Sequence, residues 1–188
     1  MATMLAAQKT TAAPGLELRE ISVPRPGPNE LLVKVRAASI CGTDVHIYHW
    51  DAPWNNGRIA PPRTMGHEVC GEVAEVGSGV TKFQKGDLVS AESHIYCGAC
   101  GRCRKGNGHI CEKLKFFGVE ADGFWADFAI IPEQNAWKNP PDMPPEMAKM
   151  LFEETRRAVL RGESLEEFLS RLTGGGLPGR KRRKGRRR

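Results

Sequence analysis

Four cysteines in the run CGACGRCRKGNGHIC are spaced so that their sulfurs can converge on one metal ion. They are separated by two, two and seven residues: Cys97, Cys100, Cys103 and Cys111. A tight turn brings thiolates two residues apart within about 4 Å of each other, as a tetrahedral Zn–S distance near 2.3 Å requires. Two disulfides, buried free thiols or an iron–sulfur cluster are the alternatives. We predict a structural zinc site with four thiolate ligands.

A second group of metal-binding residue types lies upstream. Cys41, His67 and Glu68 offer one thiolate, one imidazole and one carboxylate, and such a set leaves a fourth zinc position open. Zinc with an open position can polarise a bound hydroxyl and lower its pKa. Each residue alone has an ordinary explanation, and Cys70 is interpreted as a core residue. Together with the four cysteines downstream, they predict a catalytic zinc site.

Three motifs resemble the zinc-dependent medium-chain dehydrogenases of the alcohol dehydrogenase superfamily. They are Cys41-Gly-Thr-Asp44, Gly66-His67-Glu68, and the segment from Cys97 to Cys111. Residues 41–54, 90–100 and 119–137 are similar to the branch that oxidises L-threonine, with a polyol dehydrogenase as the alternative. The resemblance covers about residues 4–151. It implies NAD-dependent oxidation of L-threonine to 2-amino-3-oxobutanoate, with one catalytic and one structural zinc per chain.

The resemblance also implies roles for three further residues. Thr43 and His46 match a proton relay from the substrate hydroxyl to solvent, and His94 matches a position that lines the substrate pocket. A hydroxyl followed by an imidazole suits a relay, because threonine can pass a proton and histidine titrates near neutrality. The alternatives are a helix cap at Thr43 and an ordinary surface histidine at His46.

Turn residues divide the chain into short segments with strand-like alternation. The expected fold is mainly β, a partly open barrel that the resemblance identifies as GroES-like, over residues 1–141. A helical segment is expected over 142–173, with a capping box at Ser164 and Glu167, followed by a Gly-rich linker and basic tail over 174–188. The strands are expected at 16–21, 30–40, 71–77, 86–92 and 124–132.

Composition limits the classes of protein to consider. No apolar run approaches the roughly 20 residues of a membrane span, and the N-terminus lacks the apolar stretch of a signal peptide, so a cytoplasmic protein without membrane partners is expected. The net charge of +6 comes from residues 180–188, which hold eight Lys and Arg; the rest carries 20 basic and 22 acidic residues, a net charge of −2. Such a block of like charges is expected to be disordered.

The sequence departs from the superfamily where a Rossmann domain should bind NAD. Gly174-x-Gly176-x-x-Gly179 follows a predicted helix and precedes Arg-Lys-Arg-Arg, whereas a nucleotide-binding turn follows a strand and opens a helix. We therefore expect no NAD site in this chain and no activity alone. NAD would bind only with a Rossmann domain supplied in trans.

Three interpretations of this departure stay open. The chain is a truncated, fused or frameshifted product, or half of a split enzyme that pairs with a Rossmann-domain protein or forms a homo-oligomer. Alternatively, it is a non-catalytic zinc-binding module whose basic tail binds nucleic acid or another acidic partner.

Overall fold

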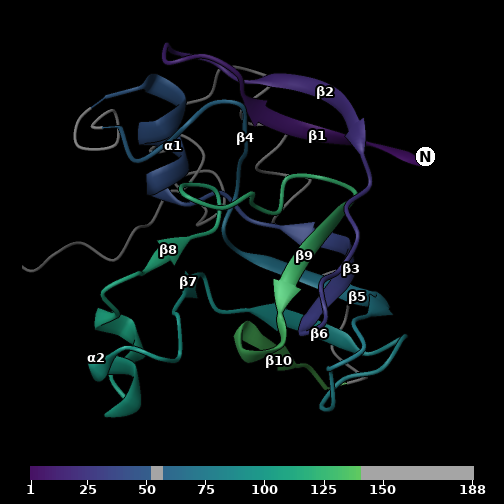
Figure 1. Cartoon of the computed structure of the whole chain (residues 1–188). Coiled ribbons are helices and arrows are strands. Elements are labelled where there is room, and N and C mark those ends of the chain that lie inside the picture. Colours follow the sequence, from purple (N-terminus) through teal and green to yellow (C-terminus); the bar gives the residue numbers. More distant parts are fainter. Residues whose placement is uncertain (52–56, 141–188) are drawn as a thin grey trace, which may run out of the picture. The chain divides into compact units, whose positions relative to one another are not determined.

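The computed structural model describes residues 1–51 and 57–140, and within them strands predominate (Figure 1). The strands are β1 (Thr3–Lys9), β2 (Glu17–Ser22), β3 (Glu30–Ala38), β4 (Arg63–Thr64), β5 (Val69–Val76), β6 (Leu88–Ala91), β7 (His94–Ile95), β8 (Lys115–Phe116), β9 (Phe128–Pro132) and β10 (Ala136–Lys138). The α-helices are α1 (Gly42–His49) and α2 (Gly101–Arg104), and the short 3-10 helices are η1 (Gly108–Ile110) and η2 (Glu133–Asn135). The expected mainly β fold is confirmed.

A five-stranded antiparallel sheet in the order β10-β6-β5-β3-β9 carries the core. Leu31 and Val33 of β3 are fully buried, and each faces the same side because strand side chains alternate. Leu31 lies opposite Ile131 of β9, and Val33 lies opposite Val73 of β5. Burying side chains of this size contributes roughly 1.5–3 kcal/mol each, so the buried side chains of β3 and of its two neighbouring strands stabilise the core of the sheet.

The remaining strands form smaller sheets. One has the order β2-β1-β4, and the other pairs β7 with β8. Within the described residues, β10 and β9 at the two ends of the large sheet are not bonded to each other, so the sheets do not close into a barrel. An isolated bridge between Ala6 and Ala126 joins β1 to the segment before β9. The arrangement is therefore open, as the sequence led us to expect.

The five expected strands correspond to β2, β3, β5, β6 and β9, with shifted ends. β9 starts four residues later than expected, because Phe124 and Trp125 pack inward instead of continuing the ladder. β1 and α1 were not anticipated. The Ala-rich sequence of β1 has weak strand propensity, and its pairing with both β2 and β4 compensates for that weakness.

A buried lysine fixes the carboxyl end of α1. Lys9 has no exposed surface, and its Nζ donates hydrogen bonds to the backbone oxygens of Ala13, Gly15 and Tyr48, the last two at 3.1 and 3.2 Å. Nζ also lies 5.0 Å from the ring centroid of Trp50. Burial lowers the pKa of Lys9. Its contacts tie α1 to β1 and hold the helix in place.

Several features expected from the sequence lie outside the described residues. These are the helical segment at 142–173 with its capping box, and the linker and basic tail at 174–188. Among the described residues, no helix has the length and apolar character needed to cross a membrane.

Candidate metal centres

The loop after β3 and the turn before β5 bring together the three residues of the first candidate site. Cys41 immediately precedes α1, and His67 and Glu68 immediately precede β5. One ligand atom from each residue lies within 4.8 Å of the others. Cys41 and His67 are half-buried, whereas Glu68 is exposed. We call this group the mixed cluster. Its residues come from two distant segments, and they are the three that the sequence predicted as one site.

A glycine allows the backbone to reach this arrangement. Gly66 has a φ of +87°, and a Cβ atom there would lie 2.2 Å from Cδ1 of Trp125. Residues with a Cβ rarely adopt such a φ, and no side chain fits at that separation. Gly123 is equally restricted, since a Cβ there would lie 2.0 Å from the oxygen of Gly66. The turn that presents His67 is thus packed directly against the segment around Trp125.

A buried carboxylate orients His67. Oδ2 of Asp44 accepts a hydrogen bond from the Cys41 backbone N–H at 2.9 Å, and Oδ1 lies 3.4 Å from Nδ1 of His67, an ion-pair distance. Asp44 is 1% exposed. Its hydrogen bond and charge raise the pKa of His67 to about 9, outweighing the opposing effect of burial. With Nδ1 facing Asp44, Nε2 is the ring nitrogen that can bind an ion, once an incoming cation displaces its proton.

The same surroundings favour the thiolate form of Cys41. Burial alone would raise the pKa of this thiol, but the backbone N–H of Thr43 and the side chain and charge of His67 lower it overall. A metal ligand must be deprotonated, and the thiolate is the form that binds metal. The mixed cluster therefore favours the ligand form of its cysteine before any ion arrives.

Glu68 contacts a serine that the sequence did not single out. Oγ of Ser39 donates a hydrogen bond to Oε2 of Glu68, and the Ser39 backbone N–H donates to the Glu68 carbonyl at 3.4 Å. Nε1 of Trp125 donates to the Ser39 carbonyl at 3.1 Å. Ser39 therefore joins the end of β3 to the turn that carries the mixed cluster.

Thr43 and His46 lie on α1, and His94 lies on β7. Thr43 and His46 are three residues apart, so they lie on neighbouring turns of one helix face. Nδ1 of His46 is 3.0 and 3.2 Å from the two carboxylate oxygens of Asp51, and the His46 side chain is 54% exposed. Nδ1 of His94 is 2.5 Å from Oε1 of Glu92. The helix thus presents the two predicted relay residues together, whereas His94 comes from a different element.

The four cysteines predicted to bind zinc gather around α2 and η1. Their sulfurs lie within 4.8 Å of one another, with 3.4 Å between Cys100 and Cys103 and 4.0 Å between Cys97 and Cys103 and between Cys100 and Cys111. Every cysteine is free. These separations suit the edges of a ZnS₄ tetrahedron and are far longer than an S–S bond of about 2.05 Å. We call residues 97–111 the cysteine lobe.

Backbone N–H groups stabilise charge on the sulfurs of the lobe. They donate to Sγ of Cys97 from Cys100 at 3.4 Å, and to Sγ of Cys111 from Cys97 and Lys113 at 3.3 Å each. Backbone donors at Cys103 and Glu112 lower the pKa of Cys100 to about 6. Burial and the neighbouring thiols raise the pKa of Cys103. Backbone donors also lower the pKa of Cys97, so two thiols of the group lose their protons more easily than a free cysteine does, and a cation would displace the remaining protons.

Two amide side chains fasten the lobe to the large sheet. Nδ2 of Asn135, which is fully buried, donates to the carbonyls of Glu92 and His94 at 2.9 and 2.8 Å. Nε2 of Gln134 donates to the carbonyl of Tyr96 at 2.7 Å. Both amides come from η2, which directly precedes β10. These hydrogen bonds hold residues 92–96, the segment that leads into the cysteine lobe.

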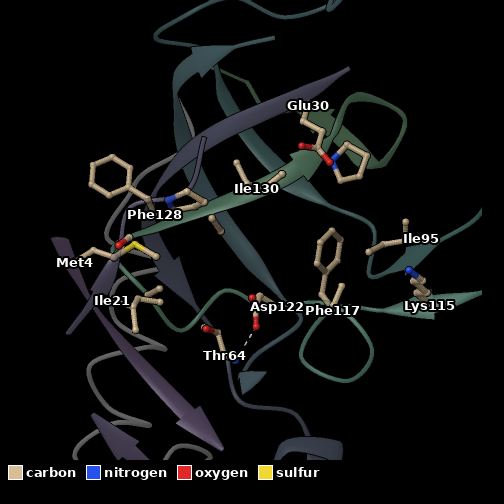
Figure 2. Close-up of a pocket in the computed structure, with 17 residues that line it drawn as sticks. Met4, Ile21, Glu30, Thr64, Ile95, Lys115, Phe117, Asp122, Phe128 and Ile130 are labelled. Atoms are coloured by element: carbon tan, nitrogen blue, oxygen red, sulfur yellow. Dashed lines mark hydrogen bonds between the residues drawn. The ribbon is translucent and has the colours of Figure 1, made fainter. Parts of the chain in front are cut away.

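A cavity of about 380 Å³ lies between side chains of β1, β2 and β9 (Figure 2). Apolar side chains from several strands line it, among them Met4, Ile21, Phe117, Phe128 and Ile130. At its edge the Thr64 backbone N–H donates to Oδ1 of Asp122 at 3.0 Å. No residue of the mixed cluster or of the cysteines in the lobe lines this cavity.

The donor sets of the two sites differ in the way that structural and catalytic zinc sites differ. Four thiolates fill a tetrahedral shell, whereas a thiolate, an imidazole and a carboxylate leave a position for a water or a substrate. The residues present fit Zn²⁺ at both places. Asp44, Ser39 and Trp125 support the three residues of the mixed cluster, and the sequence assigned none of them a role. Asp44 had a usable signal, because an acid three residues after a helix-capping position often bonds back to it.

Comparison with known proteins shows which family the chain resembles. Residues 27–141 match the alcohol dehydrogenase GroES-like domain family. L-threonine 3-dehydrogenases of Pyrococcus abyssi and Thermococcus kodakarensis are 55% and 56% identical over 147 residues, which cover 78% of this chain and 42% of each relative. The chain thus spans about two fifths of the length of these relatives.

Solved structures show the same likeness. A cobalt- and zinc-bound thermostable alcohol dehydrogenase from Pyrobaculum aerophilum matches with a TM-score of 0.67 and 33% identity, over 76% of this chain and 43% of that one. An alcohol dehydrogenase from Escherichia coli CFT073 in complex with NADH matches with a TM-score of 0.68 and 34% identity, over 86% and 46% of the two chains.

Proposed function

Because the chain belongs to the alcohol dehydrogenase GroES-like domain family, we propose that it forms the zinc-binding catalytic part of an NAD-dependent dehydrogenase that oxidises the secondary hydroxyl of L-threonine. The observation that carries the proposal is the mixed cluster, whose three ligand atoms lie within 4.8 Å of one another. The names of the relatives support the choice of substrate, and the NADH-bound structure supports a nicotinamide hydride acceptor.

In this proposal the mixed cluster holds the catalytic zinc and the cysteine lobe holds a structural zinc. When bound at the mixed cluster, zinc polarises the substrate hydroxyl and lowers its pKa. Asp44 keeps the imidazole of His67 aligned through Nδ1, and the surroundings of Cys41 lower the pKa of its thiol. The lobe contributes to folding, since four thiolate ligands leave no position for a substrate.

The proton of the substrate hydroxyl leaves through α1. Thr43 accepts it at Oγ1 and passes its own proton towards His46, which lies one turn further along the helix. Asp51 bonds to Nδ1 of His46 and so favours the tautomer with the proton on that nitrogen, leaving Nε2 as the acceptor. His46 is 54% exposed, so it can release the proton to solvent.

The hydride acceptor requires a nucleotide-binding domain. We propose that such a domain places NAD beside the mixed cluster and that the described residues supply zinc, proton relay and substrate contacts, with His94 among the last. The alternative, a zinc module that binds nucleic acid through residues 174–188, depends on residues outside the described part of the chain, and the comparisons lend it no support.

The proposal is tested by adding a separately expressed Rossmann-domain protein to the zinc-loaded full chain and following NADH formation. L-Threonine should be oxidised faster than D-threonine or sorbitol, and Cys41→Ser should abolish the reaction. Calorimetry with NAD should show binding to the mixture rather than to the chain alone. If the mixture binds NAD but forms no NADH with any alcohol, the proposal is wrong.

A further inference from the structure

We infer that Ser39 determines how Glu68 presents its carboxylate to a metal ion, so that Glu68 binds through one oxygen and leaves a coordination position open. This inference rests on the proposed function of the mixed cluster. It assigns a positioning role to a residue that lies outside the three ligands.

The hydroxyl of Ser39 controls an otherwise unrestrained side chain. Glu68 is exposed, and within residues 1–51 and 57–140 its carboxylate has one hydrogen bond, in which Oγ of Ser39 donates to Oε2. Without that bond the carboxylate could rotate freely. With it, one oxygen is engaged by a donor and the other is left for an ion.

Ser39 can serve as a fixed point because its own backbone is held. Its carbonyl accepts a hydrogen bond from Nε1 of Trp125 at 3.1 Å, and its N–H donates to the Glu68 carbonyl at 3.4 Å. The indole of Trp125 also fills the space beside Gly66, where a Cβ would be 2.2 Å from Cδ1. One ring therefore contacts both segments that carry the mixed cluster, so the distance between them is constrained.

The chemical consequence concerns coordination number. A carboxylate binds metal ions through one oxygen or two, and a two-oxygen Glu68 would occupy the position that a substrate hydroxyl needs. A hydrogen bond to one oxygen makes it a poorer second ligand. Partners of metal ligands typically contribute 10- to 100-fold to metal affinity, and Ser39 stands in that relation to Glu68.

Cobalt(II) provides the test, because it replaces zinc and its visible absorption weakens as coordination rises from four to five or six. The full chain is titrated with Co²⁺, and the spectrum of Cys41→Ser gives the contribution of the cysteine lobe alone. For Ser39→Ala we expect 10- to 100-fold weaker Co²⁺ binding at the mixed cluster and a weaker visible band per cobalt. The thiolate charge-transfer band of the lobe should stay unchanged and reports that the variant is folded.

Two further comparisons isolate the hydroxyl. Ser39→Thr keeps the donor and should restore both affinity and spectrum, whereas Ser39→Val has the same shape as the threonine variant and should not. Ser90→Ala is the matched control, since its hydroxyl bonds to Asn139 at 2.9 Å and it belongs to neither metal site.

The possible results separate the inference from the proposal beneath it. If Ser39→Ala or Ser39→Val matches the unmodified chain in affinity and spectrum, the inference is overturned and the proposed function stands. If the unmodified chain gives the same spectrum as Cys41→Ser, no ion occupies the mixed cluster, and both are overturned.

Discussion

Replacing Gly66 by alanine should destabilise the zinc-loaded protein by about 2–5 kcal/mol. Two effects contribute. Holding a residue with a Cβ at a φ of +87° costs roughly 1–2 kcal/mol. The new methyl would lie 2.2 Å from Cδ1 of Trp125, against an optimum of about 3.5–4.0 Å, so the indole must move by more than about 1 Å. Such overpacking costs typically 1–3 kcal/mol, and a displaced Trp125 also loses its bond to Ser39.

Urea unfolding of the full chain, followed by far-ultraviolet circular dichroism, measures this loss. Gly42→Ala is the matched control, because Gly42 also adjoins a ligand of the mixed cluster but has open space around its Cα and lies in α1. Alanine there should stabilise the helix by up to about 1 kcal/mol. A free energy of unfolding for Gly66→Ala within about 0.5 kcal/mol of the unmodified chain would refute the packing argument.

Three other changes have outcomes that follow from the structure. In zinc-free protein the NMR titration of His67 should have its midpoint near pH 9, and Asp44→Asn should move it towards 6.5. Folding raises the pKa of His67 above its value in the unfolded chain. The contribution of protonated His67 to the free energy of unfolding is therefore fully present below pH 6.5 and is lost as the pH rises through about 9. Asn135→Leu should lower the free energy of unfolding by about 1–3 kcal/mol in urea, since buried carbonyls lose their donor; an unchanged midpoint would count against the anchoring role. Acid or a chelator should remove zinc from the cysteine lobe and raise its hydrogen exchange while the large sheet stays protected, and uniform exchange across both would contradict this.

The sequence predicted best those features that depend on local spacing. Alternating apolar residues such as Leu31 and Val33 in the expected strand at 30–40 indicated β3, and the spacing of the four cysteines indicated that their sulfurs would meet. Both patterns act within a few residues, where strand or turn geometry alone decides what lies together. β1 escaped prediction because its residues have little strand preference, and its pairing partners lie elsewhere in the chain.

The supports of the mixed cluster could not be predicted in the same way. Residue type and the resemblance together grouped Cys41 with His67 and Glu68, but no pattern connects Ser39 with Trp125, which is 86 residues further along. Trp125 reads as an ordinary apolar residue of a strand, yet the chain turns it inward against Gly66. Contacts of this kind arise only when the sheets are assembled, because they depend on tertiary packing rather than on local preference.

Metal analysis of the purified full chain tests the central claim most directly. Mass spectrometry of the native protein, or elemental analysis per mole of chain, should find two zinc ions in the unmodified protein and one in Cys41→Ser. Cys103→Ser should lose the other ion and leave the mixed cluster occupied if the rest of the chain stays folded. One zinc ion in the unmodified chain, or two retained in Cys41→Ser, would contradict the assignment of Cys41, His67 and Glu68 as a metal site.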